Sequence, residues 1–133
     1  MSTLTDEERG ILIGLEYAKS IKLLEECDKV IQMEMWNMAA NRLYYALFHA
    51  TTALFVHDGI EVGSHRGVKA KLGQYYILTG KMAVEHSQFL ARMETLRDKA
   101  DYNIMFVAKE SDVIPNISLA EAFIKMIEEL VQK

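Results

Sequence analysis

The middle of the chain carries a run of apolar residues at helical spacing, which restricts the possible folds more than any other feature. Its members alternate four and three positions apart: Trp36, Ala40, Leu43, Leu47, Ala50 and Leu54. This spacing places them on one side of an α-helix, as in a coiled-coil seam. We expect a helix over residues 34–58, about 36 Å long, that ends at Gly59, a residue suited to a left-handed C-cap.

A first helix is predicted to begin at a capping box formed by Thr5 and Glu8. Gly10 and Gly14 then lie four positions apart, and each glycine inside a helix costs about 1 kcal/mol relative to alanine. We therefore expect another backbone to pass close to this row. A third helix is predicted over residues 65–79, with an inner face formed by Val68, Leu72, Tyr75 and Tyr76.

The fourth helix is predicted over residues 85–109, with Ile104 and Val107 facing inward. A loop over residues 110–117 then holds the only proline, and a second capping box, Ser118 to Glu121, starts the fifth helix. Short loops between long helices favour antiparallel neighbours. The expected fold is all-α, an up-and-down bundle of four long helices plus a C-terminal fifth helix, in a single domain over residues 1–133.

Several classes of protein do not fit the sequence. The single cysteine, Cys27, cannot form an intramolecular disulfide, and the acidic amino terminus is unlike a signal peptide. We expect a cytoplasmic protein without membrane contact. Glu-x-x-His pairs and zinc-binding patterns are absent from the sequence, so neither a metal nor a cofactor is expected.

Charge is distributed unevenly along the chain. The net charge is −4, yet residues 61–82 carry four basic residues against one acid, Glu61, a local balance of +3. An anionic ligand is expected to approach this central region, although a solvated helix face explains single lysines equally well.

Two groups of polar residues are candidates for chemistry. Arg42, Tyr45 and His49 share one helix face, where a cation, a phenol and an imidazole together can hold a phosphate and stack a base. The alternative is that His49 is a packing residue and that the tyrosine borders the core.

The second group is Arg97, Asp101 and Tyr102 on the fourth helix. Arg97 and Asp101 are four apart and can pair across one turn. Such a pair is often purely structural, but an arginine held by an acid also grips phosphate through its planar guanidinium.

These segments resemble the HEPN family of small helical domains. The resemblance rests on residues 39–49, on Gly59 with residues 65–68, and on residues 97–102. It is closest to stand-alone HEPN proteins encoded beside a minimal nucleotidyltransferase, as in toxin–antitoxin pairs. It implies a homodimer with polar residues in a cleft between protomers, and either a metal-independent RNase or a nucleotide-binding partner of the transferase.

The chain departs from the catalytic motif of the family, in which a histidine follows the arginine after four to six residues. Arg97 matches the arginine, but no histidine follows His86. Losing a positioned general acid–base removes about 10²–10⁴ in rate. Our preferred hypothesis is therefore a homodimer with little or no catalysis that binds a nucleotide or RNA phosphate, with a nucleotidyltransferase as its protein partner.

In that hypothesis Arg97 is the anion clamp, Asp101 its orienting acid and Tyr102 a stacking or modifiable phenol. His65 and Arg66, at the start of the third helix, add a second phosphate contact. One alternative is an RNase toxin in which His49 or His65 replaces the missing histidine. Another is a helical interaction module that docks a partner through methionine-rich faces and binds no ligand.

Overall fold

Helix α2 (Trp36–Asp58) is the centre of the protein in the computed structural model, and it contacts α1, α4 and α5. The structure describes residues 4–61 and 65–132, with the backbone alone of His65 and Arg66. The other elements are α1 (Asp6–Gln32), α3 (His65–Leu72), the π-helical segment η1 (Gly73–Ile77), α4 (Val84–Tyr102) and α5 (Glu110–Val131).

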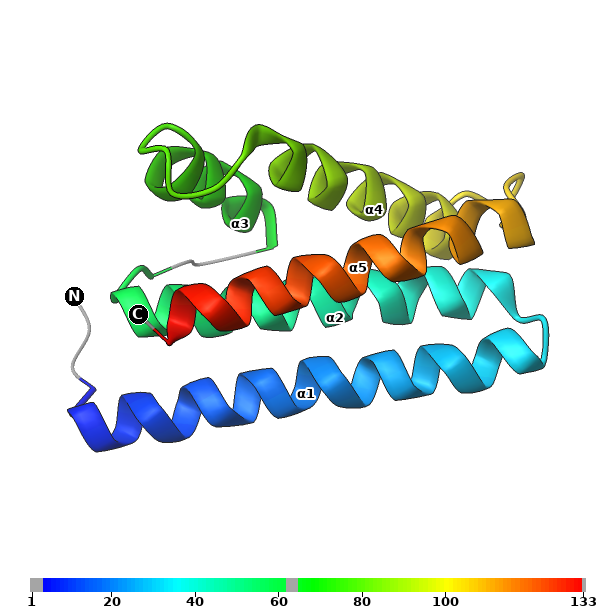
Figure 1. Ribbon diagram of the computed structural model, residues 1–133. Helices are drawn as coiled ribbons and strands as arrows, with labels where there is room; N and C mark the ends of the chain where they lie inside the picture. Colours follow the sequence, from blue (N-terminus) through cyan, green and yellow to red (C-terminus); the bar gives the residue numbers. More distant parts are fainter. Residues whose placement is uncertain (1–3, 62–64, 133) are drawn as a thin grey trace.

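The long helices α1, α2, α4 and α5 alternate in direction, with α1 on one side of α2 and α4 on the opposite side (Figure 1). The predicted all-α, up-and-down bundle is confirmed, although the third helix is short. In the part of the chain that is described, no helix is both long and apolar enough to cross a bilayer.

The predicted seam of α2 forms the core. Its five members from Ala40 to Leu54 are each at most 1% exposed, and Trp36 packs against the cluster from its edge. Small side chains allow α1 to approach α2 closely. The Ser20 hydroxyl of α1 donates to the Ala46 carbonyl of α2 over 2.6 Å, and both residues are fully buried.

As predicted, Gly59 is the C-cap of α2, and it adopts a left-handed conformation with φ of 72°. Arg9 of α1 donates to the Val56 carbonyl over 2.5 Å and so satisfies one of the last acceptors of the helix. This contact connects the start of α1 to the end of α2.

The start of α1 also confirms the prediction, because the Thr5 hydroxyl accepts from the Glu8 amide and the Glu8 carboxylate accepts from the Thr5 amide. The backbone expected beside Gly10 and Gly14 is not supplied by residues 4–61 or 65–132. Apart from the neighbouring residues and the backbone of α1 itself, a Cβ atom built at either glycine would meet no described atom within 4 Å. Both glycines lie on an exposed surface of α1, so the expectation of a close neighbour within the protomer is wrong.

The predicted helix over residues 65–79 is regular only to Leu72 and then widens into η1. Tyr76 in this wide turn is 1% exposed, stacks on Phe55 with ring centres 5.9 Å apart, and donates its hydroxyl hydrogen to Asp58. Tyr75 was also expected to face inward, but it is 38% exposed.

The fourth helix ends at Tyr102, seven residues before the predicted end. Asn103 is extended, and its side-chain oxygen accepts from the Met105 amide over 2.9 Å. Such local bonds from asparagine compete with helix propagation. Ile104 and Val107, expected in the core, are 97% and 73% exposed, so that prediction is wrong.

The fifth helix begins at Glu110, eight residues before the predicted start. The Asp112 carboxylate accepts from the Lys109 amide over 2.8 Å and supports this earlier start. Pro115 lies inside the helix, and Ser118 and Glu121 are ordinary helical positions with no capping role. The predicted loop and second capping box are therefore wrong.

Candidate functional site

Arg97 lies between α4 and α2, where most of its surface is covered. Its guanidinium carbon lies 5.1 Å, 5.3 Å and 5.7 Å from the ring centres of Tyr44, Tyr45 and Tyr102. Its side chain is only 10% exposed. Contacts with three ring faces stabilise a cation and restrict its motion. Arg97 is therefore a rigid positive group at the centre of the candidate site.

Two carboxylates accompany this cation. Asp98 Oδ1 lies 2.9 Å from Arg97 Nη2, whereas Asp101 Oδ2 lies 3.9 Å from Nη1. The predicted pairing of Arg97 with Asp101 is present, but Asp98 is the closer acid. Burial opposes the charge of Arg97, yet Tyr45, Asp98, Tyr44 and Tyr102 together raise its pKa, so the guanidinium stays charged.

A continuous polar network links this site to α1. Asn41 of α2 donates to Asp101 over 2.9 Å and accepts from Arg42 over 2.8 Å, and Arg42 Nε donates to Glu26 of α1 over 2.9 Å. Asp101 is thus held by groups from two helices. We refer to Arg97, Tyr44, Tyr45, Asp98, Asp101 and Tyr102 as the Arg97 cluster.

The three residues predicted to share a face of α2 separate into two environments. Tyr45 joins the Arg97 cluster, whereas Arg42 and His49 lie toward α1. His49 Nδ1 is 3.3 Å from Glu16 Oε2 on α1. The structure therefore gives His49 a carboxylate partner on α1, as expected for an interhelical packing residue.

The remaining histidines and basic candidates are distributed elsewhere. The side chains of His65 and Arg66 lie outside the described residues, so their predicted phosphate contact stays a prediction. His86 packs on Phe123 with ring centres 6.0 Å apart. It precedes Arg97 by three turns of α4, about 16 Å along the helix.

Tyr102 forms the accessible edge of the site, since it is 76% exposed. By contrast, the predictions did not include Tyr44 and Glu94 as candidates. Tyr44 is 1% exposed, and its hydroxyl donates to Glu94 Oε2 over 3.4 Å, whereas Glu94 Oε1 pairs with Lys69 of α3. The sequence alone does not show that Tyr44 is buried while Tyr45 is partly exposed. This difference depends on where α4 crosses α2.

One donor in the Arg97 cluster has no acceptor in the part of the chain that the structure describes. Arg97 Nε is buried and makes no hydrogen bond within the described residues. Buried polar atoms are satisfied in the great majority of cases, so an exception calls for an explanation such as a water or a ligand. A free donor on a fixed cation is a suitable contact for an oxyanion.

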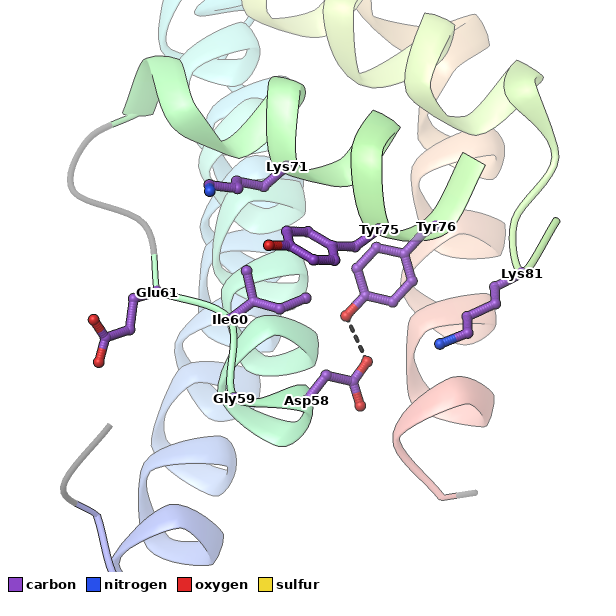
Figure 2. A pocket seen from close by; sticks show the side chains of 8 residues that line it. All are labelled: Asp58, Gly59, Ile60, Glu61, Lys71, Tyr75, Tyr76 and Lys81. Carbon is purple, nitrogen blue, oxygen red and sulfur yellow. Dashed lines mark hydrogen bonds between the residues drawn. The ribbon is translucent and has the colours of Figure 1, made fainter. Parts of the chain in front are cut away.

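A separate hollow of about 450 Å³ lies between the end of α2 and η1 (Figure 2). Lys71, Lys81, Tyr75 and Tyr76 line it, and Lys71 Nζ lies 5.6 Å from the centre of the Tyr75 ring. These lysines belong to the basic stretch that was expected to attract anions. Asp58 and Glu61 also line the hollow, so its charge is balanced and the Arg97 cluster remains the candidate site.

Three tyrosines with raised pKa values predict how the stability of the protein changes at alkaline pH. Burial, together with the Glu128 carboxylate, raises the pKa of Tyr17 to about 12, and burial raises the pKa of Tyr44 and Tyr76 further. Unfolded tyrosine ionises near pH 10. The pKa of each of these tyrosines is higher in the folded than in the unfolded protein, so its protonated form stabilises the fold. This contribution to the free energy of unfolding is complete below pH 10 and is lost as the pH rises through 10 to 12 and above.

We therefore expect base-induced unfolding, with three of the six tyrosines ionising only as the fold is lost. Near-ultraviolet absorbance of tyrosinate and circular dichroism, followed together, measure this. Ionisation of all six tyrosines at pH 10 with full helicity would contradict it.

The fold and this cluster define a class of protein, a small α-helical bundle with a buried arginine set among tyrosines on its central and fourth helices. A family model described as the HEPN domain matches residues 16–130. The chain belongs to the HEPN domain family.

Relatives agree with this assignment. A UPF0332 protein of Thermotoga maritima is 33% identical over 125 residues, which cover 94% of this chain and 95% of that protein. A UPF0332 protein of Archaeoglobus fulgidus is 26% identical and covers 91% of this chain and 96% of its own length. A protein of Methanocaldococcus jannaschii named as a candidate toxin is 27% identical over 71% of this chain and 64% of its own length.

Proposed function

We propose that this HEPN domain forms a cytoplasmic homodimer that binds a nucleotide or an RNA phosphate at the Arg97 cluster and has a nucleotidyltransferase as its partner. The observation that carries the proposal is the guanidinium of Arg97, which has one buried N–H donor without an acceptor among the described residues and lies beside the exposed ring of Tyr102. A phosphate meets the first group, and a base stacks on the second.

Access to Arg97 depends on Asp98. The Asp98 side chain is 54% exposed, whereas that of Arg97 is 10% exposed, so Asp98 is the partner that can turn toward solvent. A phosphate group carries more charge than one carboxylate and accepts from a guanidinium at two oxygens. It can therefore displace Asp98 and pair with Arg97.

The binding experiment is calorimetric titration of the protein with ATP and with a short single-stranded RNA. Arg97→Ala is expected to weaken binding at least tenfold, and Arg92→Ala is the matched control on the exposed side of α4. Asp98→Asn should tighten binding, because it removes the competing charge. Absence of binding by the wild type, or equal affinity for Arg97→Ala, would remove the proposal.

A transferase partner has a candidate surface next to the cluster. The turn between α1 and α2 and the segment after α4 lie at the same end of the bundle (Figure 1), and Ala108 N donates to Asn37 Oδ1 over 2.8 Å between them. This end exposes Met33, Ile104, Met105 and Val107. Exposed apolar groups that lie together mark protein contacts. We therefore expect the wild-type protein to co-purify with a nucleotidyltransferase and the Ile104→Asp variant not to do so.

The second candidate function is a metal-independent RNase, which is favoured by the toxin name of the archaeal relative. It requires a histidine to move protons, and His49 is the described histidine nearest in sequence to Tyr45 of the cluster. Cleavage of RNA in EDTA that His49→Ala abolishes would favour this function over the first. Intact RNA with retained binding would favour the first.

A further inference from the structure

The hollow between the end of α2 and η1 (Figure 2) is balanced in charge by its residue types, but its charged groups are not equally available. Each oxygen of the Asp58 carboxylate already has a partner within the protein, because Oδ1 lies 2.7 Å from His57 Nδ1 and Oδ2 accepts from the Tyr76 hydroxyl. The Glu61 side chain points away from Asp58 and Tyr75 (Figure 2). Neither acid therefore pairs with a lysine of the hollow.

The two lysines of the hollow, Lys71 and Lys81, keep their charges available. No carboxylate of the described residues forms an ion pair with either ammonium group. The Lys71 ammonium lies 5.6 Å from the centre of the Tyr75 ring. Figure 2 shows this ammonium and the Tyr75 hydroxyl on one side of the hollow, and Lys81 on the other side, beyond Tyr76. The hollow therefore has a cation on each of two opposite sides.

The wide turn of η1 explains this arrangement. Tyr75 and Tyr76 are adjacent, yet Tyr76 is buried against Phe55 whereas Tyr75 is partly exposed beside the hollow. The chain then turns back, since Gly80 is left-handed with φ of 76° and the Lys81 amide donates to the Tyr76 carbonyl over 2.9 Å. This turn brings Lys81 back to the hollow. Single π-helical turns are frequent at functional sites, so the backbone also favours a binding site here.

The wall between the two lysines is largely apolar. Ile60 and the rings of Tyr75 and Tyr76 lie between Lys71 and Lys81 (Figure 2). The volume of about 450 Å³ is within the range of small-molecule sites. Ammonium groups bind acidic groups through charge-assisted hydrogen bonds, and an apolar wall favours a carbon body. A molecule with an acidic group at each end of a short carbon chain has this combination of properties.

We propose that the hollow binds a small organic dianion. One acidic group lies between the Lys71 ammonium and the Tyr75 hydroxyl, both of which are donors, and the other acidic group pairs with Lys81. The positive balance of residues 61–82 attracts such a ligand. The described residues that line the hollow include no member of the Arg97 cluster, so this binding is independent of a phosphate at Arg97.

Titration of the isotope-labelled protein with straight-chain dicarboxylates, from succinate to pimelate, tests the proposal by nuclear magnetic resonance. Amide shifts are expected to saturate at residues 58–61 and 71–81, with the tightest binding at one chain length. A monocarboxylate of that length should bind about tenfold more weakly, because it lacks one of two charged contacts.

Three results of this titration would overturn the proposal. They are the absence of saturable shifts with every dicarboxylate, equal affinity for the monocarboxylate, and shifts confined to residues 97–102. A short RNA that shifts the amides of the hollow, where the dicarboxylates do not, would also overturn it and would indicate a nucleic-acid contact instead.

Lysine variants test the two ends of the ligand separately. Lys71→Met and Lys81→Met each remove one cation and keep an unbranched side chain, and each should weaken dicarboxylate binding about tenfold. In Lys81→Met the dicarboxylate should bind no more tightly than the monocarboxylate, a result that lower stability alone would not give. Lys22→Met, at an exposed position of α1, is the matched control and should bind as the wild type does. Full affinity in both variants of the hollow, or an equal loss in Lys22→Met, would overturn the proposal.

Discussion

Replacing Leu47 with alanine is expected to lower the free energy of unfolding by about 2–5 kcal/mol. Leu47 is fully buried in the middle of α2, which contacts α1, α4 and α5. Loss of its side chain removes apolar contacts and leaves a cavity that rigid helices on several sides cannot fill by moving.

Urea denaturation followed by circular dichroism measures this loss. The matched control is Leu78→Ala, where the leucine is 83% exposed, and its effect should stay within about 0.5 kcal/mol. Similar unfolding midpoints for the two variants would contradict the central position of α2. The comparison holds the chemical change constant and varies only burial.

Replacing Pro115 with alanine is expected to raise the free energy of unfolding, by up to about 3 kcal/mol. Pro115 is the sixth residue of α5, beyond the first turn, where its ring lacks a hydrogen-bond donor and crowds the carbonyl four residues before it. Pro115 is also exposed, so its ring contributes little packing that alanine would lose.

The control for this variant is Ser118→Ala, at an exposed position one turn further along α5. Its gain should be no more than about 0.5 kcal/mol, the difference in helix propensity. Thermal unfolding of both variants provides the comparison. Destabilisation by Pro115→Ala would mean that residues 110–117 require the proline in a loop conformation, contrary to the observed helix.

Helix boundaries were predictable where a local signal acted alone. The capping box at Thr5 and the glycine at position 59 define the start of α1 and the end of α2, because their effects involve only neighbouring backbone groups. The signals around α4 and α5 were misleading. Asn103 ended α4 early through its own side chain, and α5 extended through Pro115.

The candidate site was predictable in part. Arg97 and Asp101 pair as expected from their spacing of four residues, Tyr102 contacts Arg97 from the same helix, and Tyr45 joins them from α2. The closer contact of Asp98 depends on the rotamer of an exposed side chain, which spacing does not determine. Arg42 and His49 pair with acids of α1, because the position of α1 against α2 decides which acids they meet.

Periodicity and capping by themselves determined that this chain is all-helical and that α2 is its core, because both properties follow from the order of apolar and polar residues along one helix. Only the tertiary structure decided which polar groups meet. The Arg97 cluster forms where α4 crosses α2, and the polar network reaches α1 through Asn41 and Arg42. Such contacts depend on the angle and offset between helices, which arise from packing of the whole bundle rather than from any local pattern.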